Sequence, residues 1–418
     1  MDQNERRILR DLARKQMEIA SLPVMAERKA KWYRLNDGEA AEPLVTFEFN
    51  GPPEEIYPVS QCRSETLRAM EYQMNYNITS HELLADDRVV PDYLSVPVQN
   101  RFNGFSRKID REKTSYSDGQ PSMGYHSLAP VSDMEADFDQ FRKSSYRVDR
   151  GMAEAKKIKA EWEEAVGDIL PVRVQFPSFA YNMANTICEM MGMEVMMTSM
   201  YDYPDLFRRA MDMLTRDYLA YMDEIEEAGA ILTNNDGSLL YQGSWGYTNA
   251  LPGPEDVQGK VTFQDVWGFT EMQECADIAP DMVYEFFFAY LERVANRLGL
   301  LSFGCCEPVD RYWDKCLSRL DNLRKLSVSP WCDEKWIADC IRGKKIVFHR
   351  KPMPNYISVD QVFDEDAFRK HIGFTAEAAR GCPLEVTFRD VITARGEPHR
   401  LTRAVAITKE EFVRRWKP

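Results

Sequence analysis

Polar and apolar positions alternate with two different periods along the chain. Between residues 204 and 228 the apolar positions fall on one face of a helix, and Gly229 is suited to end that helix. Residues 42–49, EPLVTFEF, combine alternation with β-branched residues and are typical of a strand. Apolar spacing also predicts helices at 5–17 and 63–75. The pattern therefore indicates a mixed α/β protein.

From about residue 170 onward, helices and short strands succeed one another regularly. A long helix is predicted to begin at Pro280 and to stop at Gly299. Five strands are each followed by polar or reactive side chains; they are AILTN (230–234), LLSFG (300–304), LRKLSVSP (323–330), KKIVF (344–348) and LEVTF (384–388). Strands that alternate with helices imply a parallel sheet, because a parallel connection needs a crossover helix.

The position of these side chains favours a closed barrel over an open sheet. Ligands bind at the carboxyl ends of parallel strands in both architectures, but here the candidate residues follow many consecutive strands. The sequence contains neither G-x-G-x-x-G nor a Walker A motif. We predict a single (β/α)8 TIM barrel domain over 1–418, with an N-terminal helical and loop elaboration. Residues 1–40 form the helical extension and 41–418 the barrel, with a long loop insertion near 97–132 and two charged helices over 133–166.

Composition narrows the function classes. The chain has 418 residues, and 53 Lys and Arg against 67 Asp and Glu give a net charge of −14, which disfavours a nucleic-acid partner. No run of about 18 apolar residues is present, and the charged N-terminus lacks the apolar core of a signal peptide. We therefore expect a cytoplasmic protein with no membrane partner. Its nine cysteines are expected to be reduced.

Cys305, Cys306 and Glu307 form the sharpest local cluster. Adjacent strand residues point to opposite faces, so one of the two thiols is expected at a barrel mouth. A thiolate there binds zinc or takes up a methyl group, and the carboxylate completes the site or acts as acid or base. Alternatively, both cysteines are small buried residues and Glu307 pairs with an arginine.

Other strand ends offer further candidates. His349 suits a metal ligand or a general acid or base, and Arg350 and Lys351 beside it would hold a carboxylate or phosphate. Asp390 follows the last strand as a site residue or as the cap of a turn. The ordinary alternatives are a loop histidine and surface ion pairs.

Two segments are candidates for substrate binding. Asn234, Asn235 and Asp236 are favoured turn residues that would also offer donors and acceptors to a ligand. Tyr241, in YQGSWGYTN, and Trp267, in QDVWGF, belong either to a packed lid or to a flat wall for an aromatic or macrocyclic ligand. No C-x2-C or H-E-x-x-H zinc signature occurs.

Several stretches carry a family resemblance. GCCEPVD, DNLRKLSVSPW, VFHRKPMPN and GCPLEVTFRDVITARGEPHRL resemble the uroporphyrinogen decarboxylase-like superfamily, in the branch grouped with corrinoid-dependent methyltransferases. RKAKWYRLND and MYDYPDLFRRAMDMLTRDYLAYM fit the same branch, and the resemblance spans roughly residues 28–410. It implies a barrel with a deep cleft at the carboxyl strand ends. Superfamily members decarboxylate uroporphyrinogen without a cofactor, or move methyl groups between a substrate, a corrinoid protein and a carrier.

The sequence departs from the methyltransferase zinc pattern. In the family, zinc is held by a His-x-Cys at one strand end and by a later cysteine. Here the histidine position is Gly304 or Phe303, and the later cysteine falls near Asp390. A zinc site would need a rearranged set, drawn from Cys305, Cys306, Glu307, His349 and Asp390.

The leading prediction is a methyltransferase that acts with a corrinoid protein on a small methylated or methoxylated substrate. Glu307 or Asp390 would serve as acid, His349 as acid or ligand, and Lys351 as an electrostatic clamp. The alternatives are a decarboxylase of a porphyrinogen-like substrate and a corrinoid- or tetrapyrrole-binding protein without turnover. The arginine-rich RQAGRY-like run of the decarboxylases is missing. Possible partners include a second copy of the chain in a homodimer.

Overall fold

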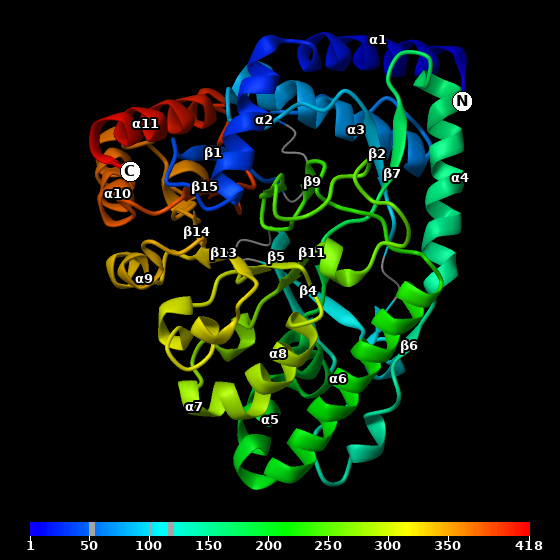
Figure 1. Cartoon of the computed structure of the whole chain (residues 1–418), viewed down its shortest axis with the longest axis vertical. Coiled ribbons are helices and arrows are strands. Elements are labelled where there is room, and N and C mark those ends of the chain that lie inside the picture. The colour runs from blue at the N-terminus through cyan, green and yellow to red at the C-terminus, as the bar shows by residue number, and fades with distance from the viewer. Residues whose placement is uncertain (50–54, 100–101, 116–120) are drawn as a thin grey trace.

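A computed structural model describes residues 1–49, 55–99, 102–115 and 121–418. Figure 1 shows α1 and α2 lying across one end of the molecule, α4 along one side, and α5 to α8 grouped at the opposite end. The sheet lies between these groups, and the C-terminal helices α10 and α11 pack beside it.

The chain alternates helices and strands for most of its length. The helices are α1 (Gln3–Ala20), α2 (Pro23–Asn36), α3 (Glu65–Thr79), α4 (Val148–Val166), α5 (Met183–Asp202), α6 (Pro204–Glu227), α7 (Pro280–Val283), α8 (Ala289–Ala295), α9 (Glu334–Ile341), α10 (Glu365–Ala378) and α11 (His399–Arg415). The strands are β1 (Leu44–Phe47), β2 (Leu94–Pro97), β3 (Phe102–Asn103), β4 (Arg111–Ser115), β5 (Pro121–Ser127), β6 (Ser145–Tyr146), β7 (Val172–Gln175), β8 (Phe179–Ala180), β9 (Ser238–Leu239), β10 (Trp245–Gly246), β11 (Trp267–Thr270), β12 (Leu300–Phe303), β13 (Leu323–Val328), β14 (Val347–Arg350) and β15 (Leu384–Phe388). A π-helical stretch, Tyr284–Phe288, joins α7 to α8, so the helix predicted from Pro280 is present but ends at Ala295.

The main sheet has seven parallel strands in the order β1-β15-β14-β13-β12-β11-β8. The predicted parallel α/β architecture is therefore confirmed. A closed eight-stranded barrel is not present in the strand pairing of the described residues, because β2 and β7 form a separate parallel pair. At the β1 edge, the N–H groups of Val45 and Phe47 donate to the side chains of Asp87 and Asp86. These carboxylates occupy donors that a neighbouring strand would otherwise use.

The strand predicted at 230–234 is wrong, because these residues have no regular secondary structure. The Asn234 side chain accepts a hydrogen bond from the Trp267 N–H at 2.8 Å and donates to the Trp267 carbonyl at 3.0 Å. The Asn234 side chain thus makes hydrogen bonds with the β11 backbone that a neighbouring strand would otherwise make. The helix before it is confirmed as α6, with Gly229 at a left-handed φ of +61°.

The region before the main sheet is more structured than expected. The predicted loops near 97–132 contain the short strand β3 and the antiparallel pair β4–β5; residues 100–101 and 116–120 lie outside the described residues. Of the two charged helices predicted over 133–166, α4 is confirmed. The first is wrong, because Asp137 accepts hydrogen bonds from Ser132 and from the Asp133 N–H, which favours a turn over a helix.

The main sheet has a polar inner face near its carboxyl end. Alternation along β13, β14 and β15 puts Lys325 and Ser327, His349, and Glu385 and Thr387 on the same face, and the register pairs His349 with both Ser327 and Glu385. Residues of opposite parity, such as Arg350, point to the helices outside. This parity decides which candidate side chains reach the site.

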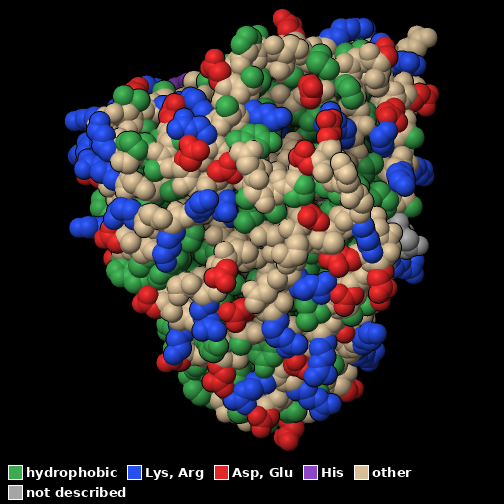
Figure 2. Space-filling view, in the orientation of Figure 1, with side chains coloured by type: hydrophobic (Ala, Val, Ile, Leu, Met, Phe, Trp, Pro, Cys, Tyr) green, Lys and Arg blue, Asp and Glu red, His purple; other side chains and the backbone are tan. Residues whose placement is uncertain are grey.

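The outer surface carries both signs of charge. Figure 2 shows acidic and basic side chains interspersed over most of the visible face. Within the described part of the chain, no helix is both long enough and apolar enough to cross a membrane.

Candidate functional site

A layer of buried polar side chains lies inside the sheet. Lys325 and Glu385, both fully buried, form an ion pair at 2.8 Å, and the Ser244 hydroxyl bridges them at 2.5 and 3.0 Å. His349 Nε2 lies 2.9 Å from the Thr387 hydroxyl, and burial, aided by nearby cations, lowers the pKa of His349 well below its usual value. His349 is therefore neutral at pH 7.

The hairpin β9–β10 enters the sheet from its amino end, because Tyr247 at its base packs with Leu44 and Val347, the first residues of β1 and β14. Its turn reaches the carboxyl end, where Gln242 meets Lys351. Its turn residues Tyr241, Gln242 and Gly243 all have left-handed backbones, with φ of +65°, +57° and +76°. Glycine is required at 243, because a Cβ there would lie 2.4 Å from Thr387 Cγ2. Non-glycine residues in this conformation are strained, and such strain is concentrated at functional sites. The hairpin therefore fills the inside of the sheet and contributes Ser244 to the polar layer.

Gln242 of the hairpin bonds charged side chains that lie at two strand ends. Its carbonyl oxygen accepts a hydrogen bond from Lys351 Nζ at 2.7 Å and another from the Arg389 guanidinium. Arg389 also pairs with Glu48, which follows β1, and its Nη1 lies 3.7 Å from Cys305 Sγ. We call Glu48, Gln242, Cys305, Lys351 and Arg389 the strand-end cluster.

The two cysteines differ in environment. Cys305 is half-buried beside the cations of the cluster, whereas Cys306 is exposed, and their sulfurs are 3.6 Å apart. The hydrogen bond from Cys306, together with Lys351 and Arg389, lowers the pKa of Cys305 to about 6, and the same bond raises that of Cys306. Burial lowers the pKa of Lys351 to about 8. Cys305 is therefore the thiol that faces the cluster, and it is largely a thiolate at pH 7.

Glu307 supports the strand-end cluster by binding the backbone next to Cys305. It is only 1% exposed, and its two oxygens accept hydrogen bonds from the Met272 and Cys305 N–H groups at 2.9 and 2.7 Å. Glu271 is buried nearby, and this burial, with the charges of Glu274 and Glu307, raises its pKa well above the usual range. Glu307 thus fixes the turn that presents Cys305.

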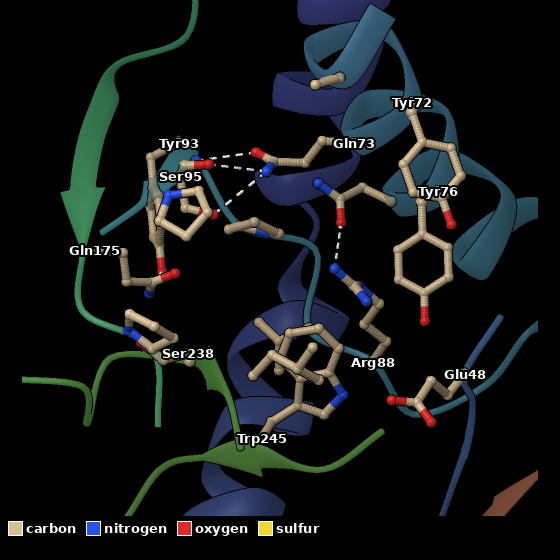
Figure 3. A pocket seen from close by; sticks show the side chains of 18 of the residues that line it. Glu48, Tyr72, Gln73, Tyr76, Arg88, Tyr93, Ser95, Gln175, Ser238 and Trp245 are labelled. Carbon is tan, nitrogen blue, oxygen red and sulfur yellow. Dashed lines mark hydrogen bonds between the residues drawn. The ribbon is translucent and has the colours of Figure 1, made fainter. Parts of the chain in front are cut away.

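A cavity of about 550 Å³ lies on the other side of the hairpin, bounded by α3, β2 and β7. Figure 3 shows side chains from these elements converging on it. Its walls are rich in aromatic residues, including Tyr72, Tyr76, Tyr93, Tyr241, Trp245 and Tyr247. Glu48 and Arg88 are the charged groups among its described lining residues. The volume lies within the range of small-molecule sites, and Glu48 belongs both to the cavity wall and to the strand-end cluster.

The structure brings together only some of the predicted site residues. Cys305 and Lys351 meet in the strand-end cluster, and Tyr241 lines the cavity and stacks on Phe269. His349 lies deeper, in the polar layer. Asp390 is exposed and has a left-handed backbone, so its neighbour Arg389 takes the inward position.

The remaining predicted binding residues have structural contacts instead. Arg350 points outward to an ion pair with Glu334 at 2.6 Å, and Trp267 is fully buried in an apolar cluster. Asn234 is bonded to the β11 backbone and Asn235 to the carbonyls of residues 248 and 251. Asp236 accepts hydrogen bonds from Gln175 and Ser238. None of these five side chains lines the cavity.

The predicted zinc ligands do not form a ligand set. Glu307 is used by backbone N–H groups, His349 is bonded to Thr387 in the polar layer, and Cys306 and Asp390 are exposed. Over residues 1–49, 55–99, 102–115 and 121–418, no three His, Cys, Asp or Glu side chains are grouped to hold a metal ion. The residues present therefore do not fit the zinc ion of the family.

Sequence reasoning missed Glu48, Gln242 and Arg389. Glu48 directly follows a correctly predicted strand, so the strand-end rule that selected the other candidates would have found it. Arg389 was passed over for the adjacent Asp390. Gln242 had no local signal, because its role depends on the hairpin entering the sheet.

Comparison with known proteins places the fold. A methyltransferase from Methanosarcina mazei matches over 92% of this chain and 99% of its own, with a TM-score of 0.51 and 16% identity. A B12-independent methionine synthase from Shewanella sp. W3-18-1, in complex with selenomethionine, matches over 90% of this chain and 98% of its own, with a TM-score of 0.39 and 13% identity. No protein-family model and no curated protein sequence matches the chain.

The chain is therefore an α/β protein that shares its fold with the Methanosarcina methyltransferase. At 16% identity this likeness concerns the fold alone, and the second match is too weak to carry an argument. The comparison supports the predicted α/β fold, and the place in the uroporphyrinogen decarboxylase-like superfamily stays a prediction from the sequence.

Proposed function

We propose that this chain is a methyltransferase that takes a methyl group from a small methoxylated or methylated substrate and passes it to a corrinoid protein. The observation that carries the proposal is the aromatic-walled cavity next to the strand-end cluster, with Glu48 common to both. The fold shared with a methyltransferase and the sequence resemblance support the same reaction class.

The reaction makes definite demands on the chain. For a methoxylated donor, the bond between the methyl carbon and oxygen breaks, and the carbon bonds to cobalt, which supplies the electron pair. The corrinoid is a co-substrate carried by the separate protein. The oxygen leaves with the electron pair of the broken carbon–oxygen bond and needs a proton, so the chain must hold the donor, exclude water and supply that proton.

Residues of the cavity and of the strand-end cluster can meet these demands. The aromatic walls bury a ring or a methylated group. Lys351 is the acid of the strand-end cluster: with a pKa of about 8 it is mainly protonated at pH 7, yet it is a stronger acid than an ordinary lysine. Gln242 and Arg389 connect it to Glu48 at the cavity wall. Zinc has no part in the proposal, because its ligand set is not formed.

The cavity favours methyl transfer over decarboxylation of a porphyrinogen. A porphyrinogen carries several carboxylates around a four-ring system and needs several cations to hold it. Arg88 is the one cation among the described lining residues. A small donor with at most one carboxylate matches this lining better.

The test uses the purified chain, free cob(I)alamin as acceptor, and a panel of methoxylated aromatic compounds and methylated amines. The loss of cob(I)alamin absorbance and the appearance of methylcobalamin report transfer. We expect donor-dependent transfer that falls by about 100-fold in Lys351→Met, in the range usual for loss of a general acid. Lys335→Met, at an exposed lysine on α9, is the matched control and should leave the rate unchanged.

Absence of methylcobalamin with every donor would contradict the proposal. Release of CO2 from a carboxylated donor without methyl transfer would favour the decarboxylase. Binding of donors without any turnover would favour a non-catalytic binding protein.

A further inference from the structure

Arg88 is the most unusual side chain in the cavity. It is only 7% exposed, it lines the cavity, and its Nη2 donates to Asn77 Oδ1 at 2.7 Å. Its Nε and Nη1 are buried and have no hydrogen-bond partner among the described residues. Figure 3 shows the guanidinium amid the lining side chains, near Tyr76 and Trp245. Buried donors without acceptors are rare in folded proteins, and those of a cation are the most costly.

Trp245 adds a second unsatisfied donor beside the first. The guanidinium carbon of Arg88 lies 3.9 Å from the Trp245 ring centroid and 4.1 Å from that of Tyr76. Trp245 Nε1 is also buried, lines the same cavity and has no acceptor in the described chain. Two adjoining side chains thus present N–H groups that need an acceptor. Stacked rings leave the in-plane N–H groups of a guanidinium available.

The charge of Arg88 is not cancelled by an ion pair. The carboxylate of Asp86 interacts with Arg88 through space, but it accepts hydrogen bonds from Ser80 and from the backbone of residues 47 and 88. Burial raises the pKa of Asp86, which weakens it further as a counter-ion. Glu48, the other charged lining residue, is paired with Arg389. The cavity therefore has one uncompensated positive charge at Arg88.

We propose that the cavity binds a small aromatic carboxylate, with the carboxylate held by Arg88 and Trp245 and the ring between the tyrosine side chains. A carboxylate matches the guanidinium fork, and its single charge equals the one cation present, whereas a phosphate dianion would need a second. Together with the proposed function, on which this step rests, the site implies that the methyl donor is a methoxylated or methylated aromatic acid.

The test compares two probes of nearly equal shape, 4-methoxybenzoate and the neutral 4-methoxybenzyl alcohol. Their affinities for the full chain at pH 7 are measured by calorimetry and by tryptophan fluorescence. We expect the acid to bind about 10- to 100-fold more tightly, which corresponds to a charge-assisted hydrogen bond. Arg88→Gln should remove this preference and Arg88→Lys should keep part of it.

Matched variants separate a binding role from a structural one. Arg173→Gln is the control, because Arg173 also stacks on a tyrosine, Tyr93, at 4.4 Å but does not line the cavity. It should leave the preference unchanged. Trp245→Phe removes one N–H group while keeping a ring, and should reduce the preference several-fold. If thermal unfolding shows that Arg88→Gln does not fold, the Trp245→Phe variant still tests the binding role.

Equal affinity for the two probes in the wild type would overturn the inference, and so would a preference that survives in Arg88→Gln. The binding readout is independent of turnover. A preference that depends on Arg88 without methyl transfer would sustain the carboxylate site and contradict the proposed function. Methyl transfer from neutral donors alone, at a rate that does not change in Arg88→Gln, would support the proposed function and contradict the carboxylate site.

Discussion

The thiol pair gives a sharp test of the electrostatics at the strand ends. Replacing Cys306 by alanine removes the S–H group 3.6 Å from Cys305 Sγ, the largest cause of the lowered Cys305 pKa. A hydrogen bond to a thiolate at a half-buried site is worth about 1.4 kcal/mol, or about one pKa unit. We therefore expect the pKa of Cys305 to rise from about 6 to about 7 in Cys306→Ala.

The cations should keep the variant below the usual value of a thiol. A unit charge at 3.7 Å, the distance from Arg389 Nη1 to the sulfur, contributes about 4 kcal/mol at an effective dielectric constant of about 20. Solvent near the sulfur reduces that contribution, and the cost of burying the thiolate opposes it. The remaining stabilisation is enough to keep the pKa of Cys305 in Cys306→Ala clearly under about 8.5.

The assay is alkylation by iodoacetamide as a function of pH, with each cysteine quantified by tandem mass spectrometry. The midpoint of the rate, rather than its size, is the readout, because a thiolate of low pKa is also a weaker nucleophile. Cys332→Ala is the control, since Cys332 is half-buried and its pKa is raised by burial to about 11. A wild-type midpoint near 8.5, or one that does not move in Cys306→Ala, would refute the reasoning.

Three further predictions concern stability, each measured as the free energy of unfolding in urea. Lys325→Met should cost about 3 to 5 kcal/mol because it leaves a buried charge unpaired, and adding Glu385→Leu should recover most of that loss; equal losses in both variants would contradict the paired role. Gly243→Ala should cost about 2 kcal/mol or more, from the close contact with Thr387 and the left-handed backbone, and an unchanged stability would mean that the hairpin does not enter the sheet as described. Lys351 has a pKa of about 8 in the folded chain against 10.5 for an ordinary lysine, so between these values the unfolded state binds more protons. Wild-type stability should therefore rise with pH across that window relative to Lys351→Met, and parallel curves for the two proteins would be the contrary result.

The sequence was sufficient to predict the later strands of the main sheet, because their apolar, β-branched runs are bounded by turn residues. Cys305 and Lys351 were both among the strand-end candidates, and the structure brings them together, whereas the sequence left open which of Cys305 and Cys306 faces the site. The choice between Arg350 and Lys351 depended on where β14 ends. The strand was predicted to stop at residue 348 but runs to 350, and only its full course shows which side chains face inward.

The cavity could not be predicted from local sequence. Its walls come from α3, from the pair β2–β7 and from the hairpin β9–β10, which are far apart along the chain. Complete closure of the predicted barrel is not shown by the strand pairing of the described residues, for a related reason. Asp86, Asp87 and Asn234 use their side chains where strands were expected to pair, and short polar side chains give no sign of this in a strand-like pattern.

The hairpin β9–β10 has neighbours on two sides. Tyr241 and Trp245 face the cavity, while Gln242 between them holds Lys351 and Arg389. A ligand that displaces either aromatic ring also displaces the amide on which the two cations converge. The cavity wall and the contacts of the Cys305 sulfur therefore share one five-residue turn, and a substitution in that turn alters the surroundings of both.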